Sequence, residues 1–215
     1  MNTKQRTWLC IAIFTAIIII DQLVKILVKT HMYIGQDIPL IGSWCRLHFI
    51  ENEGFAFGTS FGGVTGKYLL TLFRIAASVA IVWIIVRHLR HHGRFSLILC
   101  LTLILAGALG NIIDSCFYGL IFSESYYQIA TLFPASGGYA PFLQGKVVDM
   151  FYFPLFSFQW PQWLGGGHFE FFSAIFNIAD AAITIGVIWL LIDQILLGAD
   201  KKNHVGEKKK FEKNN

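Results

Sequence analysis

Two aspartates carry the chemistry that this sequence could perform. Asp180 lies near the start of the apolar run "FNIADAAITIGVIWLLIDQILL", where a carboxylate costs about 3 kcal/mol on membrane-insertion scales. No Lys or Arg lies within one helical turn of it, so it needs a partner from elsewhere in the chain or must be protonated. Asp149, in "GKVVDMF", is the natural partner because it stands between apolar neighbours in a segment that could dip toward the membrane. Taken alone, a carboxylate in that setting is more typical of a turn or an ion pair.

Two carboxylates in a site of low dielectric share one proton, because the pKa of one of them rises. The ionised acid can then take a proton from water while its partner protonates or hydrogen-bonds a carbonyl oxygen. The pair predicts hydrolysis without a metal and without a covalent intermediate. The seven histidines show no metal-ligand spacing such as H-E-x-x-H, and no nucleophile motif such as G-x-S-x-G occurs.

Two further carboxylates are expected at the depth of Asp180. At the rise of an α-helix, Asp21 lies about 10 Å from the outer end of the first apolar run, and Asp114 ends the third. Three acids in the outer third of a membrane are not expected by accident. Asp21 and Lys25 are four residues apart in the favourable order, and this pair is more typical of a structural ion pair than of catalysis.

Small and polar residues share one face on two of the expected helices. Spacing of three and four residues places Asn177, Asp180 and Thr184 on one stripe. A second stripe lies before Asp114, and helix packing alone would explain it equally well. Its members are Gly107, Gly110, Asn111 and Asp114.

Four apolar runs must position these residues. The chain is 55% apolar and only 14% charged, whereas soluble domains carry about 25% charged residues. Residues 8–28, 64–86, 95–114 and 172–197 are each long enough to cross about 30 Å of hydrocarbon as a helix. The sequence predicts a mainly α membrane protein, with four transmembrane helices and a small β-rich cap between spans 1 and 2 and spans 3 and 4.

The basic residues predict the orientation of these spans. Lys and Arg gather before the first run, in the loop "RHLRHHGR" and after the fourth run, and they are sparse in loops 29–63 and 115–171. Both termini are therefore expected in the cytoplasm and both long loops outside. The net charge of +4 reflects this asymmetry, so it does not call for nucleic-acid binding. Residues 1–200 are expected as one membrane domain, and 201–215 as a basic, disordered tail.

The outer loops contain strand-like and aromatic stretches. "RLHFI" and "GKVVDMFYF" are rich in strand formers, whereas "PLFSFQWPQWLGGGHFEFF" is typical of residues at the headgroup level. Residues 120–144 form a polar loop without an assigned role. The four cysteines do not form a disulfide framework, although a bridge between Cys45 and Cys116 stays open.

Five segments in series resemble the lipoprotein signal peptidase family (signal peptidase II), four-span aspartic peptidases of bacteria. They are "DQLVK" (21–25), "ENEGFAFG" (51–58), "GALGNIID" (107–114), "GKVVDM" (145–150) and "FNIADAAI" (176–183). The resemblance implies an enzyme of the bacterial cytoplasmic (inner) membrane with its active site at the outer face. It would cut the signal peptide from prolipoproteins before a cysteine that carries diacylglycerol. The family needs no cofactor or metal and is blocked by cyclic-peptide antibiotics. The oligomeric state stays open.

The resemblance also implies a role for individual residues. Asp149 and Asp180 fall on the catalytic pair, and Asn52 and Gly54 fall on the motif that lines the substrate channel. The remaining matches are supporting polar positions: Asn111, Asp114, Asn177, Asp21 and Lys25.

Two departures from the family pattern concern the outer side. Ser115 follows Asp114 where the family usually has arginine, so another group must do the work of that arginine or the chain must dispense with it. The chain also inserts residues between "YGL" (118–120) and "GKVVDM", and its aromatic stretch before Asn177 is long.

A small proton- or ion-coupled transporter is the main alternative, because buried acids also mark ion pathways. Such a pathway needs polar residues through the full depth of the bilayer. The inner halves of the spans, such as "WLCIAIFTAIIII" and "GVIWLLI", are almost purely apolar. A structural scaffold would leave the shared depth of the carboxylates unexplained.

Overall fold

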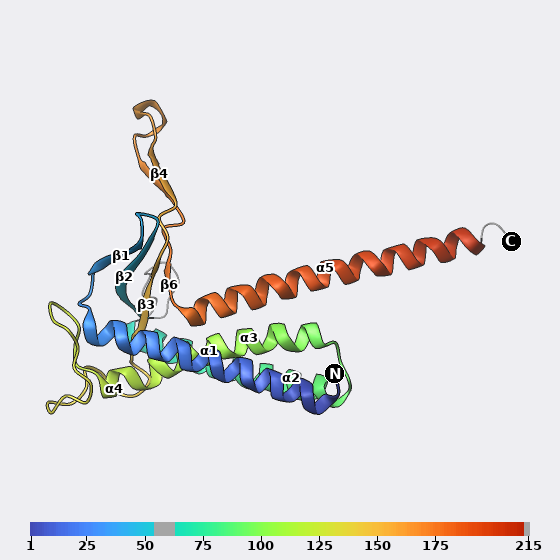
Figure 1. Ribbon diagram of the computed structural model, residues 1–215, viewed down its shortest axis with the longest axis horizontal. Coiled ribbons are helices and arrows are strands. Elements are labelled where there is room, and N and C mark those ends of the chain that lie inside the picture. The colour runs from blue at the N-terminus through green and yellow to red at the C-terminus, as the bar shows by residue number, and fades with distance from the viewer. Residues whose placement is uncertain (54–62, 213–215) are drawn as a thin grey trace.

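The computed structural model describes residues 1–53 and 63–212, with side chains up to residue 197. Four of its helices are long and apolar enough to cross a membrane, as the sequence predicts. They are α1 (Thr3–His31), α2 (Gly63–Arg90), α3 (Phe95–Ile113), which continues through the π-helical turn η2 (Asp114–Tyr118) into α4 (Gly119–Ile121), and α5 (Ile178–Glu212). α1, α2 and α3 lie side by side, and α5 begins beside the sheet, packs on α3 and then diverges from the other helices toward its C-terminus (Figure 1).

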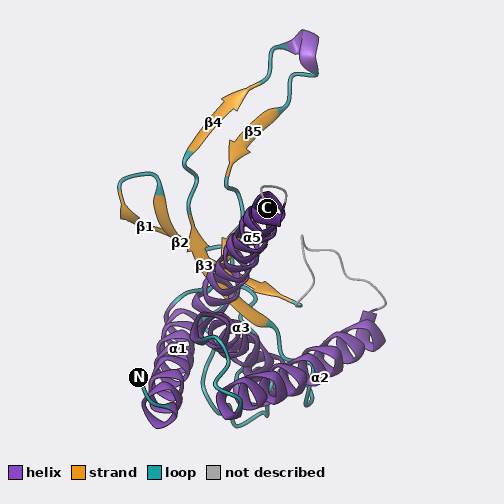
Figure 2. Ribbon diagram, turned by 90° about the vertical axis from the view of Figure 1, so that its right-hand side faces the viewer, coloured by secondary structure: helices purple, strands orange, loops and turns teal. Residues whose placement is uncertain are grey.

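An antiparallel sheet lies at the end of the bundle where α1 ends and α5 begins (Figure 2). Its strand order is β1-β2-β3-β6, with β1 at Asp37–Ile41, β2 at Cys45–Asn52, β3 at Val147–Tyr152 and β6 at Ile175–Phe176. A separate hairpin consists of β4 (Phe156–Gln159) and β5 (His168–Phe171), with the short turn η3 (Gln162–Leu164) at its tip. Both strand-like stretches of the sequence are therefore strands, and the β-rich cap is confirmed.

A hydrophobic cluster fixes the sheet to the helices. Phe49 of β2 and Val148 and Met150 of β3 are fully buried against Val28 and Met32 at the end of α1. Tyr118, Phe122 and Ala130 complete the cluster from the segment that follows α3. Burial of these side chains holds β3, and with it Asp149, against the bundle.

Glycines let α3 and α5 pack closely. A Cβ atom added to Gly107 would lie 2.1 Å from the carbonyl oxygen of Ala179, and one added to Gly186 would lie 2.8 Å from that of Cys100. At Gly110 the added atom would lie 2.8 Å from Oδ2 of Asp21. The glycine stripe of α3 therefore serves helix packing, and the same packing sets the position of the first turn of α5.

The Gly107→Ala substitution is expected to lower the free energy of unfolding by about 2–3 kcal/mol, because the new methyl group meets backbone that cannot rotate away. Thermal unfolding in detergent measures the effect. Gly167→Ala is the matched control, since a Cβ atom there would have no atom within 4 Å. Equal stability of the two variants would contradict this account of the α3–α5 contact.

The fourth span begins later than the sequence predicts. Residues 172–177 do not continue the helix, because Ile175 and Phe176 pair with Tyr152 and Phe151 of β3. α5 starts at Ile178, after Asn177 has capped it. At its other end α5 continues to Glu212, so the backbone of 201–212 is helical where a disordered tail was expected. The Lys and Glu in this segment have high helix propensity, and extending an existing helix avoids the cost of nucleation.

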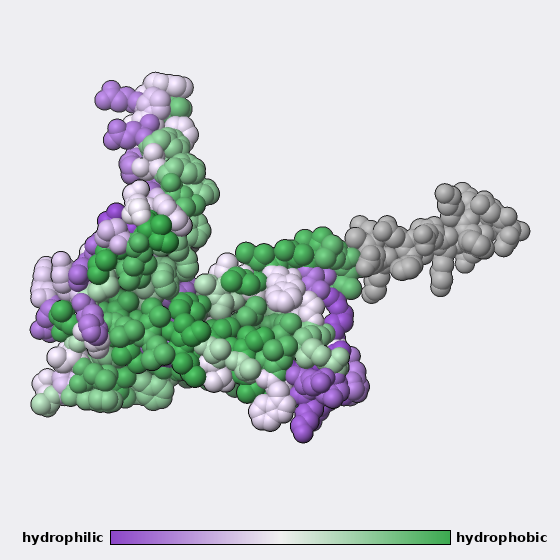
Figure 3. Space-filling view, in the orientation of Figure 1, coloured by the Kyte–Doolittle hydropathy of each residue, from purple (hydrophilic) through white to green (hydrophobic). Residues whose placement is uncertain are grey.

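Most of the surface of the spans is apolar, as expected for contact with lipid. Only 17% of the apolar windows of α1 and α2 is buried, and 56% of that of α3, which lies between its neighbours. Figure 3 shows the apolar surface over these helices and polar residues at the end that holds the N-terminus.

All four cysteines are free and buried, so Cys45 and Cys116 do not pair. Gly54, which the resemblance assigns to the substrate channel, lies outside the described residues.

Candidate active site

Asn177 joins the two aspartates that the sequence singles out. Its Nδ2 donates to Oδ1 of Asp149 on β3 at 2.6 Å, and its Oδ1 accepts from the backbone N–H of Asp180 at 2.8 Å. The backbone N–H of Asn177 in turn donates to Oδ2 of Asp180 at 3.4 Å. This is a reciprocal N-cap, in which Asn is the cap residue and Asp stands three residues later. The local sequence "NIAD" thus starts α5 and places Asp180 in its first turn, where a negative charge is favoured.

Two further amides approach the carboxylates. Asn111 of α3 donates to Oδ1 of Asp180 at 2.7 Å, and Asn52 at the end of β2 donates to Oδ2 of Asp149 at 3.3 Å. Asp149 is buried, with only 2% of its surface exposed, whereas Asp180 is partly exposed. The structure therefore brings together the pair and three of the supporting residues named from the sequence.

Lys25 lies at the centre of a buried charge cluster behind the pair. Its Nζ contacts Asp21 at 2.9 Å and Asp114 at 2.7 Å, and it donates to Oδ1 of Asn111 at 2.9 Å. Lys25 is completely buried. The ammonium orients the Asn111 amide so that its nitrogen faces Asp180. Asp21 and Lys25 form a buried ion pair, which fits a structural role. Lys25 also holds Asn111, a residue of the site.

Asp21 also holds the start of α5. Its Oδ1 accepts the backbone N–H of Ala179 at 2.8 Å, one of the helix N-terminal donors that has no partner within the helix. Gln22, which the sequence analysis did not single out, donates to Asp114 at 2.9 Å and accepts from the hydroxyl of Tyr118 at 3.1 Å. α1 and α3 thus fix the turn that carries Asp180.

Arg74 of α2 is a further charged residue near the pair that was not predicted from the sequence. Its guanidinium interacts electrostatically with Asp180, Asp149 and Asp114, in decreasing order. A single Arg within the second apolar run is the sequence signal that could have revealed it. α2 therefore contributes positive charge to the site.

A second polar cluster ties segment 120–146 to β2. Lys29 pairs with Glu51 and donates to the hydroxyl of Ser125 at 2.7 Å. Lys146 lies 3.3 Å from Glu51 and 3.1 Å from Glu124. Burial acts to raise the pKa of Glu51, but the positive charges of Lys29 and Lys146 outweigh it and hold that pKa below its ordinary value. Since Asn52 follows Glu51, the cluster supports the strand end that reaches Asp149.

The surroundings of Asp149 favour its protonated form. Burial, and then the negative charge of Asp180, raise the pKa of Asp149 to about 7, although hydrogen bonds from Asn52 and Asn177 work in the other direction. Asp149 is therefore protonated below neutral pH. The pair can hold one proton at the buried acid, beside an acid that is open to the surroundings. This is an arrangement that can activate water.

Comparison with known proteins places the chain. The family model "Signal peptidase (SPase) II" matches residues 13–196. The chain belongs to the signal peptidase II family. It is 46% identical over 185 residues to a lipoprotein signal peptidase of Porphyromonas gingivalis, and the alignment covers 84% of this chain and 80% of that protein. A lipoprotein signal peptidase of Amoebophilus asiaticus is 34% identical over 195 residues, covering 88% and 79%.

The chain is also similar to solved structures of membrane enzymes. A chain described as a bacterial membrane enzyme is similar with a TM-score of 0.59 at 25% identity, covering 89% of this chain and 90% of that one. The resemblance found in the sequence is thereby confirmed. Family membership and the four apolar helices make the chain a multi-pass bacterial membrane protein of a peptidase family.

Proposed function

We propose that the chain is an intramembrane aspartyl endopeptidase. It removes the signal peptide from diacylglyceryl-modified prolipoproteins by cutting before the lipidated cysteine. The observation that carries the proposal is the Asp149–Asn177–Asp180 bridge, in which one carboxyl is buried with a raised pKa and the other is partly exposed. Membership of the signal peptidase II family supports the substrate class.

The geometry favours one division of roles. Asp180, which accepts from Asn111 and is attracted by Arg74, takes a proton from the attacking water. Asp149 gives its proton to the carbonyl oxygen, and a tetrahedral diol forms. The C–N bond then breaks as the proton on Asp180 passes to the leaving amine, and Asp149 regains its proton from a hydroxyl of the diol.

The bundle also supports a location for the reaction. The distribution of Lys and Arg favours cytoplasmic termini, with the sheet and the aspartate pair at the outer face of the inner membrane. A signal peptide helix would reach the pair from within the bilayer, and the lipid on its cysteine would stay at the surface. Residues 1–200 would form this single peptidase domain.

Cleavage of a defined precursor tests the proposal. The chain in lipid nanodiscs is expected to cut a diacylglyceryl-modified precursor before its cysteine, as read by mass spectrometry, and to leave the unmodified precursor intact. A cyclic-peptide antibiotic of the class that blocks the family is expected to stop the reaction. Absence of a cut, or a cut that does not depend on the lipid, would overturn the proposal.

The transporter alternative has less support. α5 carries no charged residue between Asp180 and Asp193, so the carboxylates at the sheet end do not continue along it as a polar pathway. Proton uptake into vesicles that contain the chain, driven by a substrate gradient, would revive it.

The rate of cleavage is expected to fall as pH rises through about 7, because the pKa of Asp149 is raised to about 7. Below that pH the pair holds the proton that the carbonyl oxygen must receive. Above it Asp149 has lost that proton and cannot donate it. A profile of kcat/KM between pH 5 and 9 measures this limb, and a rate that is constant to pH 9 would contradict the assignment of the proton to Asp149.

A further inference from the structure

The β4–β5 hairpin has one aromatic face and one polar face. Phe156 pairs with Phe171 and Phe158 with Phe169, with ring centroids 4.8 and 5.0 Å apart. Side chains alternate between the faces of a strand, so the other pairs lie on the opposite side. These are Ser157 with Glu170 and Gln159 with His168. Each strand therefore has aromatic side chains on one face and polar side chains on the other.

The aromatic face has no cover within the described chain. Its four phenylalanines are 39–53% exposed. Trp160 packs edge-on against Phe158, and Trp163 at the tip is 81% exposed. A lone two-stranded hairpin is marginally stable in water, and an apolar patch of this kind marks a contact surface.

Contacts at the base fix the direction of the hairpin. The hydroxyl of Tyr152, the last residue of β3, donates to Glu170 on the polar face. Phe153 and Phe172 both pack on Phe176 of β6, with ring centroids 5.6 and 6.0 Å apart. The hairpin leaves the sheet across the helix axes rather than along them (Figures 1 and 2).

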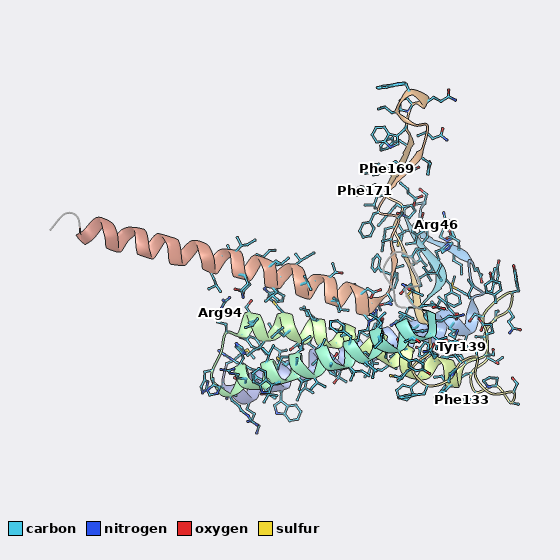
Figure 4. All side chains as sticks on the ribbon, turned by 180° about the vertical axis from the view of Figure 1, so that it is seen from behind. Arg46, Arg94, Phe133, Tyr139, Phe169 and Phe171 are labelled. Atoms are coloured by element: carbon cyan, nitrogen blue, oxygen red, sulfur yellow. The ribbon has the colours of Figure 1, made fainter. Side chains whose placement is uncertain are left out.

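The aromatic face points in the direction of the membrane spans. In Figure 3 the apolar side of the hairpin is the side on which the helices extend, and the polar side faces away from them. Figure 4 shows Phe169 and Phe171 on the side of the hairpin toward α5. A hairpin that runs across the spans, with its apolar side toward them, lies parallel to the membrane surface.

We infer that the β4–β5 hairpin lies on the lipid leaflet next to the sheet, with Phe156, Phe158, Phe169 and Phe171 inserted at the boundary of headgroups and acyl chains. The partner is bulk phospholipid, because the aromatic face is turned toward the leaflet that surrounds the spans and is rich in the residue types that prefer the interface. The polar face, with Glu170 and His168, stays in water.

The position of the hairpin in the chain gives this contact a consequence. It connects β3, which carries Asp149, to β6 and the first turn of α5, which carries Asp180. Anchoring the hairpin therefore sets the height of both carboxylates relative to the lipid surface.

A pair of fluorescent probes tests the inference. In Phe158→Cys and Gln159→Cys the new thiol carries an environment-sensitive fluorophore, and the four native cysteines are buried. In phosphatidylcholine nanodiscs, nitroxide-labelled lipid is expected to quench the probe at 158 at least threefold more than the probe at 159. Thermal unfolding compared with the unlabelled chain confirms that both variants are folded.

Three results would overturn the inference. The first is equal, weak quenching at both positions. The second is a change at position 158 only after lipid-modified precursor is added, which would make the face a substrate site. The third is self-quenching between labelled copies, which would make it an interface with a second copy. The quenching measurement does not involve cleavage, so it tests the inference about the hairpin independently of the proposed activity.

Discussion

Asp149→Asn and Asp180→Asn are each expected to cleave the diacylglyceryl-modified precursor about a thousandfold more slowly than the unaltered chain, or not at all. Asn keeps the shape of Asp but can neither give nor take the proton that moves in each step. Either substitution therefore removes half of the pair that Asn177 joins. The rate of precursor cleavage in nanodiscs measures the loss.

A carboxylate of the same sheet serves as the control. Asp37 of β1 pairs with Arg46 at 2.8 Å on the surface of the cap, so Asp37→Asn is expected to cleave at the rate of the unaltered chain. Substantial cleavage by either variant of the pair would exclude the aspartyl mechanism.

Thermal unfolding separates loss of chemistry from loss of fold. The pKa of Asp149 is about 7 in the folded chain, above its ordinary value of 3.8. Between these values the folded state binds more protons than the unfolded state, so stability falls as pH rises through this window. Asp149→Asn removes that cost and is expected to be at least as stable as the unaltered chain at pH 8. An inactive variant that is also unfolded would not fit this account.

Lys25→Met is expected to lower the free energy of unfolding by about 3–5 kcal/mol, because it leaves two buried carboxylates without their cation. Lys25 contacts both Asp21 and Asp114 and is completely buried. Cleavage is expected to fall as well, since the Asn111 oxygen loses the shorter of its two side-chain donors, which helps to orient the amide toward Asp180. Unfolding in detergent and precursor cleavage measure the two effects.

A combined variant tests whether the unpaired carboxylates cause the loss of stability. When Asp21→Asn and Asp114→Asn are added to Lys25→Met, no unpaired charge remains, and part of the lost stability is expected to return. Lys4→Met, at the exposed start of α1, is the control and is expected to change neither quantity. A combined variant less stable than Lys25→Met alone would show that the cluster acts through packing rather than charge.

Local patterns in the sequence were sufficient for much of the site. The stripe of Gly107, Gly110 and Asn111 follows from helix periodicity, and the structure places it against α5. The "NIAD" segment carries its own cap, since both reciprocal bonds join residues three apart. The same segment was assigned to a helix that begins too early, because pairing of Ile175 and Phe176 with β3 is not visible in local hydropathy.

Contacts between distant residues were not accessible in this way. Arg74 and Gln22 could not be assigned to the site from the sequence, because their roles depend on how α1, α2 and α3 meet. Segment 120–146 also had no role until Ser125 and Lys146 were found on Glu51. The partners that give these residues their roles lie on other elements, so local sequence patterns do not reveal them.

The sequence by itself determined that four helices span a membrane and that acids gather at one depth, because hydrocarbon accepts only apolar helices about 20 residues long. It also determined how α5 starts, because caps form between residues in one turn. Only the tertiary structure decided that Asp149 meets Asp180 through Asn177 and that Lys25 joins three elements behind them. It also set the direction of the aromatic hairpin. The physical reason is that burial forces each charge and amide to find a partner, and close packing of glycine-lined helices selects which partner lies within reach.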